Sequence, residues 1–348
     1  MEKNPNIPIK NIYYMIAYAY QTLSFSEYKK IGTENFENLE DLYSEILSFG
    51  IPKLIRSGLM KDYINIEENS NVIKGKININ STIKKNSIIN KKIVVNYDEY
   101  SENILINQII KATVVRLSHS RKLCKKKRRL FRGLLPYFSE VSNIQLNLKI
   151  WEEIKYNRQN IRYQFVIDIC KYLYTQLLLN EESSSQNTRE IHDEQRLASL
   201  YEKFIFEFFK KETDYDVSRP QIKWHINNGF SDALPIMKTD VVLKQEKKTL
   251  IIDTKFYSEN MVSGFGDGIK KQKSSNLYQI FSYVNNWTEK PGEIVAGMLL
   301  YVKTTSLNQP NHTYHIKGNQ FFVLSLDLNQ DFKEIKKELL EYADRFFK

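Results

Sequence analysis

The chain has 348 residues, which is enough for two domains because single hydrophobic cores usually stop growing near about 250 residues. Hydrophobic residues make up 42% and aromatic residues 13%, which excludes a disordered chain. No apolar run approaches the roughly 18–20 residues that span a bilayer, and MEKNPNIPIK lacks the apolar centre of a secretory signal. We therefore expect a cytoplasmic protein with no membrane partner. The net charge of +10 makes nucleic acid the first partner to consider.

The N-terminal half alternates between helical and strand-like patterns. Apolar periodicity predicts a buried helix over 7–23 and an amphipathic one over 37–59, interrupted near Gly50 and Pro52, which disrupt helix geometry. Segment 62–98 alternates apolar and polar residues, as half-buried strands do. Helical patterns return over 101–130 and 158–180.

The densest positive run of the chain is KLCKKKRRLFRG, residues 122–133. Its side chains could neutralise nucleic-acid phosphates, and the same cations would also suit the solvated C-terminal end of a helix. The sequence leaves both interpretations open. The candidate nucleic-acid-binding residues are Lys125, Lys126, Lys127, Arg128, Arg129 and Arg132.

A polar, serine-rich stretch at 180–193, NEESSSQNTREIHD, is the best candidate for a domain junction. We therefore expect an N-terminal domain over 1–185 and a C-terminal domain over 194–348. The pattern after the junction predicts, in order, a helix over 194–212, strands over 221–226, 235–244 and 248–257, a helix over 274–287, strands over 293–303 and 313–326, and a helix over 331–347. This α-β-β-β-α-β order with additions predicts an α/β fold.

Two polar residues follow the apolar part of the predicted strand LIIDTKFY, residues 250–257. Asp253 and Lys255 point to the same side of an extended strand, and Thr254 points away. If the preceding strand pairs with this one, Asp240 approaches Asp253. Two carboxylates that close repel each other unless a cation lies between them, and hard oxygen ligands favour Mg²⁺. The residues therefore predict a magnesium site in which Lys255 positions a water or stabilises charge on a phosphoryl group.

Three more residues could complete this site. Glu202, on the helix before the sheet, could supply a third carboxylate to the metal. Gln279 and Tyr283 lie four residues apart on one helix face, where they could orient the metal shell or contact DNA. A D-x-K spacing alone is also typical of a plain ion pair at a strand end. The acidic residue on the preceding strand and the order of elements favour the catalytic interpretation.

This layout resembles the PD-(D/E)xK nuclease superfamily, with a restriction-endonuclease-like core. Its motif would be Asp240 and Asp253-Thr254-Lys255, with Thr239 in place of the proline, and Gln279-x-x-x-Tyr283 is similar to the signature of the RecB-like branch. Within the superfamily the chain resembles the McrC family, the nuclease subunits of McrBC modification-dependent restriction systems. The stretches that carry this resemblance are IPIKNIYYMIAYAY (7–20), IKGKIN (73–78), YDEYSENILINQIIKAT (97–113), LYEKFIFEF (200–208), LPIMKTDV (234–241), LIIDTKFY (250–257) and NLYQIFSYV (276–284).

The resemblance implies a Mg²⁺-dependent DNA endonuclease subunit of an anti-phage restriction system. Its partner would be a ring-forming AAA+ GTPase, McrB, which recognises modified cytosine in double-stranded DNA. The implied division is an N-terminal α+β domain that docks on this GTPase and stimulates it, and a C-terminal PD-(D/E)xK domain that cleaves. Segment 62–98 is where we expect a projection into the ring pore.

The sequence contains no G-x-x-x-x-G-K-[ST] motif, and GFGDG at 264–268 lacks the following Lys-Ser/Thr. GTP is therefore expected to bind the partner and not this chain. One D-x-K site hydrolyses one strand at a time, so a double-strand break predicts two copies acting together.

Three other interpretations stay open. The chain could be a stand-alone Mg²⁺-dependent RecB-like nuclease that needs no NTPase. It could be a non-catalytic adaptor that keeps the fold as a DNA clamp, although intact Asp240, Asp253 and Lys255 argue against this. The third is a structural domain in which the D-x-K spacing is accidental.

Overall fold

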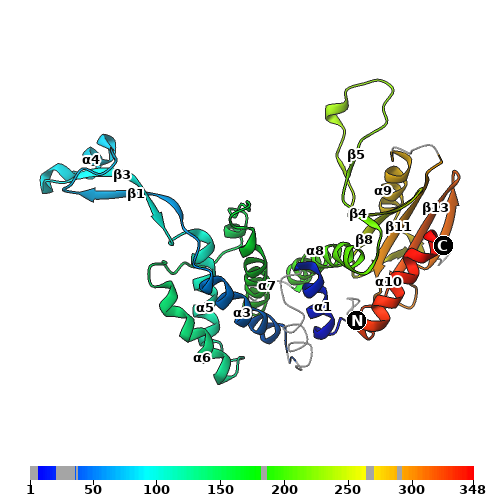
Figure 1. Cartoon of the computed structure of the whole chain (residues 1–348), viewed down its shortest axis with the longest axis horizontal. Helices are drawn as coiled ribbons and strands as arrows, with labels where there is room; N and C mark the ends of the chain where they lie inside the picture. The colour runs from blue at the N-terminus through cyan, green and yellow to red at the C-terminus, as the bar shows by residue number, and fades with distance from the viewer. Residues whose placement is uncertain (1–6, 21–35, 37, 182–185, 264–269, 288–291) are drawn as a thin grey trace. The chain divides into compact units, whose positions relative to one another are not determined.

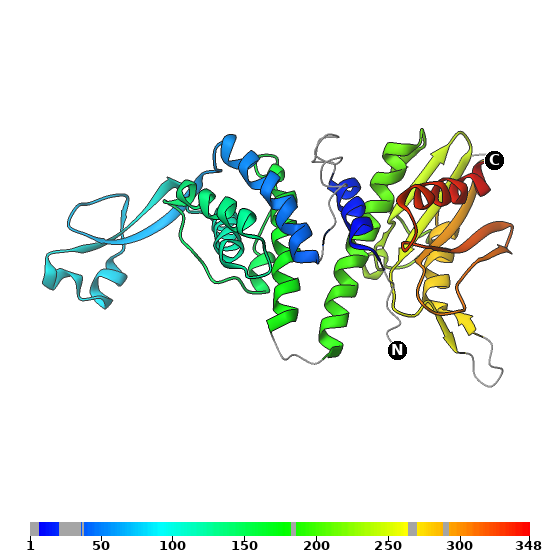
Figure 2. The same ribbon diagram turned by 90° about the horizontal axis from the view of Figure 1, so that it is seen from below.

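The computed structural model describes residues 7–20, 36, 38–181, 186–263, 270–287 and 292–348 (Figures 1 and 2). These residues form two compact units, one from Met1–Phe36 with Ser183–Lys348 and the other from Glu37–Glu182. We call the first the sheet unit and the second the helical unit. The second change of unit, between residues 182 and 183, lies in the predicted junction, and residues 1–36 group with the C-terminal part of the chain. The predicted domain bounds stay a prediction.

Helix α1 (Ile9–Tyr20) belongs to the sheet unit because it is bonded to the C-terminal part of the chain. The buried Asn11 side chain donates hydrogen bonds of 2.8 Å to the carbonyls of Leu328 and Gln330. The Tyr14 ring stacks on Phe332 with centroids 4.3 Å apart. These partners lie more than 300 residues away in sequence, so no local pattern could have assigned the helix correctly.

A six-stranded sheet organises the sheet unit, in the order β12-β13-β11-β8-β7-β4. Strand β11 runs parallel to β8 and β13, and the other neighbours are antiparallel. The strands are β4 (Asp216–Ser218), β7 (Val241–Gln245), β8 (Lys248–Lys255), β11 (Ile294–Val302), β12 (His312–Ile316) and β13 (Asn319–Leu326). The sheet and its helices confirm the predicted α/β class; the PD-(D/E)xK topology stays a prediction.

Helix α9 (Ser274–Asn285) covers one face of this sheet, and α8 (Gln186–Glu212) and α10 (Phe332–Phe347) cover the other (Figure 2). A Cβ atom on Gly297 of β11 would lie 2.7 Å from Ile280 Cγ1, so the glycine permits α9 to approach closely. Ile251 of β8 lies in the core beneath α9. Because side chains alternate along a strand, Asp253 and Lys255 are on this same α9 face.

Two predicted strands of this unit are interrupted in the structure. The strand expected over 235–244 divides into β6 (Met237–Lys238), which pairs with β5 (Gln221–Ile222), and β7, so Asp240 lies between two strands. The strand expected over 313–326 is the hairpin β12–β13, which turns at Lys317 and Gly318, both with positive φ. A short hairpin of β9 (Met261–Ser263) and β10 (Lys270–Gln272) also follows β8, and GFGDG lies outside the described residues.

The helical unit contains α3 (Leu39–Arg56), α5 (Leu105–His119), α6 (Lys125–Leu134) and α7 (Gln164–Glu181). The predicted interruption near Gly50 and Pro52 is wrong, because α3 continues through both residues. A Cβ atom on Gly50 would lie 3.0 Å from Val166 Cγ2 of α7, so the glycine permits α7 to approach α3 closely. Tertiary packing here outweighs the low helix propensity of both residues.

Residues 62–101 form an arm (Figure 1). Strand β1 (Asp62–Ser70) pairs along its length with β3 (Ile93–Ser101), which also pairs with β2 (Lys76–Ile77). The strand pattern is confirmed for these segments and is wrong for 79–90, which form α4 (Ile79–Lys84) and the 3-10 helix η1 (Ser87–Asn90). The arm buries few side chains, and its exposed large apolar residues are Tyr63, Val72, Ile73, Ile77, Ile79, Ile83, Ile88, Ile89 and Tyr100.

None of the described helices combines the length and the apolarity that crossing a membrane requires.

Candidate active site

Asp253 and Lys255 lie at the C-terminal end of β8, on the face of the sheet that α9 covers. Leu250 to Ile252 are fully buried, and Asp253 is only 1% exposed. Lys255 Nζ lies 2.5 Å from Asp253 Oδ2, an ion pair without good hydrogen-bond geometry. Burial, together with the nearby Asp240 and Glu202 carboxylates, raises the pKa of Asp253 to about 6, against the opposing effect of Lys255.

Helix α9 holds the ammonium of Lys255 through a chain of hydrogen bonds. Lys255 Nζ donates to Gln279 Oε1 at 2.9 Å, and Gln279 Nε2 donates to Tyr283 OH at 2.8 Å. Tyr283 OH in turn donates to the Lys238 carbonyl at 2.9 Å. Burial raises the pKa of Tyr283, so the hydroxyl keeps the proton that it donates. The structure thus brings the Gln-x-x-x-Tyr pair directly to the D-x-K lysine.

Asp240 lies between β6 and β7 and is fixed by Thr254. Its Oδ2 accepts hydrogen bonds of 2.8 Å from both the backbone N–H and the hydroxyl of Thr254. Thr239, one residue earlier, donates from Oγ1 to the Pro220 carbonyl at 2.8 Å. The sequence analysis named both threonines but assigned neither a hydrogen-bonding role, because neither position carries a signal of its own.

The two aspartates fit a divalent cation of the Mg²⁺ kind. Asp253 Oδ2 is a buried carboxylate oxygen whose close contact is the Lys255 ammonium at 2.5 Å, and the described hydrogen bonds to Asp240 end on its Oδ2 alone. A cation held here would offset the desolvation that raises the pKa of Asp253. Within the described ranges, however, no three His, Cys, Asp or Glu side chains gather closely enough to hold a metal. The protein would therefore supply two carboxylates, and substrate and water the other ligands.

In the described part of the chain, Glu202 of α8 is not close enough to the two aspartates to form a group of three metal ligands, and its role as a third ligand stays a prediction. Its Oε1 lies 3.2 Å from Nη1 of Arg219, which the sequence analysis missed. Burial and the Asp240 carboxylate raise the pKa of Glu202, while Arg219 lowers it. The side chain therefore lies within the electrostatic reach of the site and is paired with a guanidinium.

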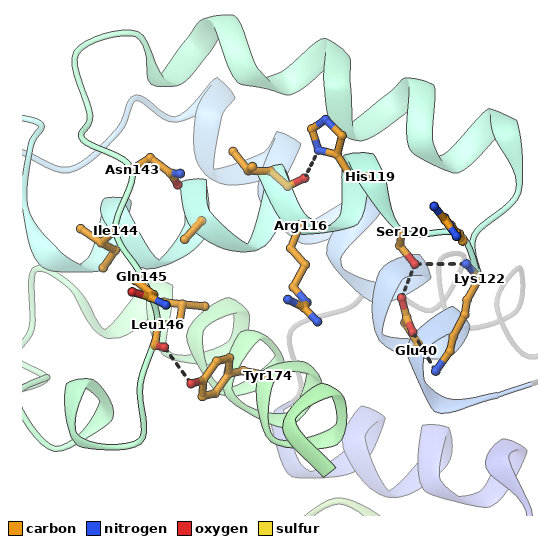
Figure 3. Close-up of a pocket in the computed structure, with 13 residues that line it drawn as sticks. Glu40, Arg116, His119, Ser120, Lys122, Asn143, Ile144, Gln145, Leu146 and Tyr174 are labelled. Atoms are coloured by element: carbon orange, nitrogen blue, oxygen red, sulfur yellow. Dashed lines mark hydrogen bonds and ion pairs between the residues drawn. The ribbon is translucent and has the colours of Figure 1, made fainter. Parts of the chain in front are cut away.

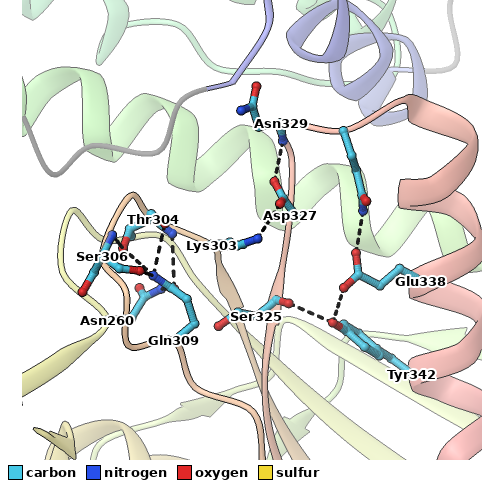
Figure 4. A network of polar contacts seen from close by, with 11 residues as sticks. Asn260, Lys303, Thr304, Ser306, Gln309, Ser325, Asp327, Asn329, Glu338 and Tyr342 are labelled. Carbon is cyan, nitrogen blue, oxygen red and sulfur yellow. Dashed lines mark hydrogen bonds and ion pairs between the residues drawn. The ribbon is translucent and has the colours of Figure 1, made fainter.

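The loops beyond β8 and β11 are tied together by a polar network near the site (Figure 4). The buried Asn260 side chain donates to the Val302 carbonyl at 2.7 Å and to Gln309 Oε1 at 3.1 Å. Gln309 Nε2 donates to Thr304 Oγ1 at 2.9 Å and to the Ser306 carbonyl at 2.7 Å. These bonds fix the carboxyl ends of two parallel strands, which is the edge where ligands bind in α/β sheets.

The members of the basic run at 122–133 differ in their contacts: Lys127 is paired within the helical unit, whereas others are exposed. Lys127 Nζ lies 2.7 Å from Asp41 and 2.9 Å from Glu45, both on α3. Burial by itself lowers the pKa of Lys127, but Asp41 and Glu45 raise it by more, so the pKa is raised overall. The charge of Lys127 is thus neutralised within the unit, and its assignment as a nucleic-acid contact stays a prediction. Arg128 is half-buried, and the exposed members of the run are Lys125, Lys126, Arg129 and Arg132.

A cavity of about 810 Å³ lies beside this run, between the end of α5 and residues 143–146 (Figure 3). Arg116, Arg121 and Lys122 contribute three cations to its lining. Glu40 is a buried carboxylate at its edge, bonded to Ser120 Oγ and 3.7 Å from Lys122 Nζ. Cations outnumber carboxylates here, so the positive surface extends from α6 towards α5.

Fold and site together define a mixed α/β protein with two aspartates and a lysine at the edge of its sheet. A family model described as "McrBC 5-methylcytosine restriction system component" matches residues 3–302, and the chain belongs to this family. It is 30% identical over 353 residues to the Type IV methyl-directed restriction enzyme EcoKMcrBC of Escherichia coli (strain K12), covering 99% of this chain and 100% of that protein. The resemblance to McrC inferred from the sequence is thereby confirmed.

A solved structure is similar in fold. It is described as "Refined half-complex from tetradecameric assembly of Thermococcus gammatolerans McrB AAA+ hexamers with bound McrC". The TM-score is 0.50 with 16% identity, and the match covers 97% of this chain and 76% of that chain.

Proposed function

We propose that this chain is the endonuclease subunit of a McrBC-type restriction complex and hydrolyses DNA phosphodiesters in its sheet unit. The observation that carries the proposal is the meeting of Asp240, Asp253 and Lys255 at the end of β8, with Gln279 and Tyr283 holding the lysine. A core ion pair needs no such support from a neighbouring helix. Membership of a restriction-system family supports the same conclusion.

The side chains divide the work of phosphodiester hydrolysis between them. Asp240 and Asp253 would hold Mg²⁺, which when bound lowers the pKa of a water and neutralises charge on a phosphoryl oxygen. Lys255 donates a hydrogen bond to the attacking water or to a phosphoryl oxygen, and Gln279 keeps the ammonium in place for it. Burial of Asp253 excludes bulk water from the carboxylate, which strengthens its hold on a cation.

A McrB-like AAA+ GTPase ring is the partner that we propose, as in the relative whose description names McrB hexamers with bound McrC. The arm of residues 62–101 is the segment proposed to enter the ring pore and stimulate GTP hydrolysis. Its isoleucines are left in water, with Ile88 65% and Ile89 79% exposed, and a surface of this kind is typical of one that binds a protein. The partner would bind GTP, since this chain lacks the P-loop motif.

The DNA proposed as substrate is a duplex that carries modified cytosine, cut in the cytoplasm by two copies of this chain. Exposed Lys125, Lys126, Arg129 and Arg132, with the cations at the cavity of Figure 3, form the proposed nucleic-acid surface of the helical unit.

The deciding experiment is cleavage of a methylated plasmid by the wild type and by Asp253→Ala, each with and without the AAA+ partner and GTP, in Mg²⁺ or in EDTA. The proposal expects cutting only by the wild type with partner, GTP and Mg²⁺. Cutting by the wild type alone would support a stand-alone RecB-like nuclease. If nothing cuts but partner GTP turnover rises, the chain is a coupling adaptor and the nuclease proposal fails.

A further inference from the structure

The backbone beside Arg219 is hydrogen-bonded to the residue that precedes Asp240. Arg219 lies between Ser218, the last residue of β4, and Pro220, whose carbonyl accepts the 2.8 Å hydrogen bond from Thr239 Oγ1. Thr239 is buried, 6% exposed, and directly precedes Asp240. The chain on one side of Arg219 is therefore bonded to the chain on one side of Asp240. A rigid mounting of this kind is what a precise contact with a ligand requires.

The guanidinium of Arg219 is held on one side and open on the other. Nη1 lies 3.2 Å from Glu202 Oε1, and Nη2 donates to the Glu202 carbonyl at 3.2 Å. The group also lies over the Phe206 ring, with Cζ 4.1 Å from the centroid. Its side chain is still 32% exposed. A guanidinium has five N–H donors, so these contacts leave donors for a further acceptor, and the planar fork matches the oxygens of a phosphate.

The carboxylates of the site repel the phosphates of DNA, so a cation is needed beside them. Asp240, Asp253 and Glu202 influence one another electrostatically, so an approaching DNA strand meets several carboxylates. Lys255 is held between Asp253 and Gln279, and only 12% of its side chain is exposed. A metal bound at the aspartates would act on the scissile phosphate itself. A neighbouring phosphate needs a cation at the edge of the acidic cluster.

We propose that Arg219 binds a backbone phosphate next to the scissile one and so positions the DNA strand across the site. The inference rests on the nuclease activity proposed above and adds a substrate-binding residue to it. Glu202 is then the partner that holds the guanidinium in place before DNA arrives. A purely structural ion pair, by contrast, would change stability slightly and DNA binding not at all.

Lys336 supplies a matched control. Its Nζ forms a 2.7 Å ion pair with Glu212, on the same helix α8 as Glu202. The Lys336 side chain is 33% exposed, close to the 32% of Arg219. Ten residues of helix separate Glu212 from Glu202, a distance of about 15 Å. Lys336→Ala thus removes a comparable ion pair away from the site.

The test measures binding of the full-length chain to a 5-methylcytosine duplex over a salt series. All variants carry Asp253→Ala so that the duplex is not cut. Arg219→Ala is expected to weaken binding about tenfold or more at low salt, and to reduce the slope of log affinity against log salt by about 0.9, the value for one lost phosphate contact. Arg219→Lys keeps the slope and loses part of the affinity. Lys336→Ala should bind like its parent.

Two outcomes overturn the inference. One is an affinity and slope for Arg219→Ala equal to those of Lys336→Ala. The other is an equal loss in Glu202→Gln. This variant removes one carboxylate but keeps the Glu202 carbonyl and the Phe206 ring that hold the guanidinium, so it should keep or increase affinity. An equal loss would mean that the ion pair between helix and loop is itself needed. Thermal unfolding checks each variant, and Arg219→Lys replaces Arg219→Ala if the latter is unfolded. The proposed nuclease activity fails separately, if wild type with partner, GTP and Mg²⁺ does not cut methylated plasmid.

Discussion

Lys255 of strand β8 is held by Gln279 of helix α9, through the 2.9 Å hydrogen bond from its Nζ to Gln279 Oε1. Tyr283 decides which way the Gln279 amide points. Its hydroxyl donates to the Lys238 carbonyl, so it can only accept from Gln279 Nε2, and the amide oxygen is left facing the ammonium. Three elements of the sheet unit thus cooperate to place one cation.

Tyr283→Phe is expected to reduce the cleavage rate about 10–100-fold, the range seen when a residue that orients a site residue is removed. The variant lets the Gln279 amide rotate, which loosens Lys255, and it leaves the Lys238 carbonyl without its donor. Plasmid cleavage under saturating Mg²⁺ measures the effect. Tyr278→Phe, on the same helix but 70% exposed, is the control and should cleave like the wild type. Equal rates for the two variants would contradict a role for Tyr283.

Asp253→Ala, Lys255→Ala and Asp240→Asn are each expected to reduce DNA cleavage at least about 100-fold, because each removes a charge on which the reaction depends. Stimulation of the partner's GTPase should be unchanged, since all three residues lie in the sheet unit and the arm lies in the helical unit. Cleavage and GTP turnover measured on the same complexes separate the two activities. Cleavage retained by any of the three variants would remove that residue from the site.

Stability in EDTA should depend on pH through Asp253. Its pKa is raised from 3.8 to about 6 by burial, so the folded protein binds this proton more tightly than the unfolded chain does. The free energy of unfolding therefore falls as the pH rises from about 4 to about 6 and is lowest above that window, by up to about 3 kcal/mol.

Asp253→Asn removes this titration. The difference in free energy of unfolding, variant minus wild type, should therefore increase between about pH 4 and about pH 7. Urea unfolding at the two pH values measures it. The unpaired Lys255 in the variant adds an offset that does not change over this range. A difference that is independent of pH would show that Asp253 is ionised normally in the folded protein.

Lys127→Ala is expected to destabilise the protein by about 3 kcal/mol, because it leaves Asp41 and Glu45 without their shared cation. Only 14% of the Lys127 side chain and 13% of the Glu45 side chain are exposed, so water screens the pair weakly. Lys126→Ala, at an exposed neighbour, should leave the unfolding transition unchanged and weaken DNA binding. Denaturant unfolding and duplex binding of both variants check this; the reverse pattern would identify Lys127 as the DNA contact.

Ile89→Ser, in the arm, should abolish most of the stimulation of the partner's GTPase without affecting stability. Ile89 is 79% exposed, so the substitution removes no packing from the isolated chain. Ile161→Ser, in the helical unit at a residue 52% exposed, is the control and should stimulate GTP hydrolysis normally. GTP turnover is the measurement, and DNA cleavage by the complex should fall in parallel. Full stimulation by Ile89→Ser would exclude that residue from the contact with the ring.

The hydrophobic pattern of the sequence correctly predicted the helices and strands that depend on residues close together in the chain. Helices such as α9 and α10 and the buried strand β8 follow from apolar periodicity within their own residues. It failed where partners distant in sequence decide the outcome. Helix α3 continues through Gly50 because Val166 packs there, and α1 joins the sheet unit because Asn11 finds carbonyls at the other end of the chain.

The sequence by itself determined which residues could form the site, because the D-x-K spacing puts two side chains on one face of a strand and the Gln-x-x-x-Tyr spacing puts two on one face of a helix. Only the tertiary structure decided how they are used. It packs α9 over Asp253 and Lys255, ties Asp240 to Thr254, turns Glu202 towards Arg219 and commits Lys127 to α3. Spacing fixes directions within one element, whereas charge pairing and burial depend on which elements meet.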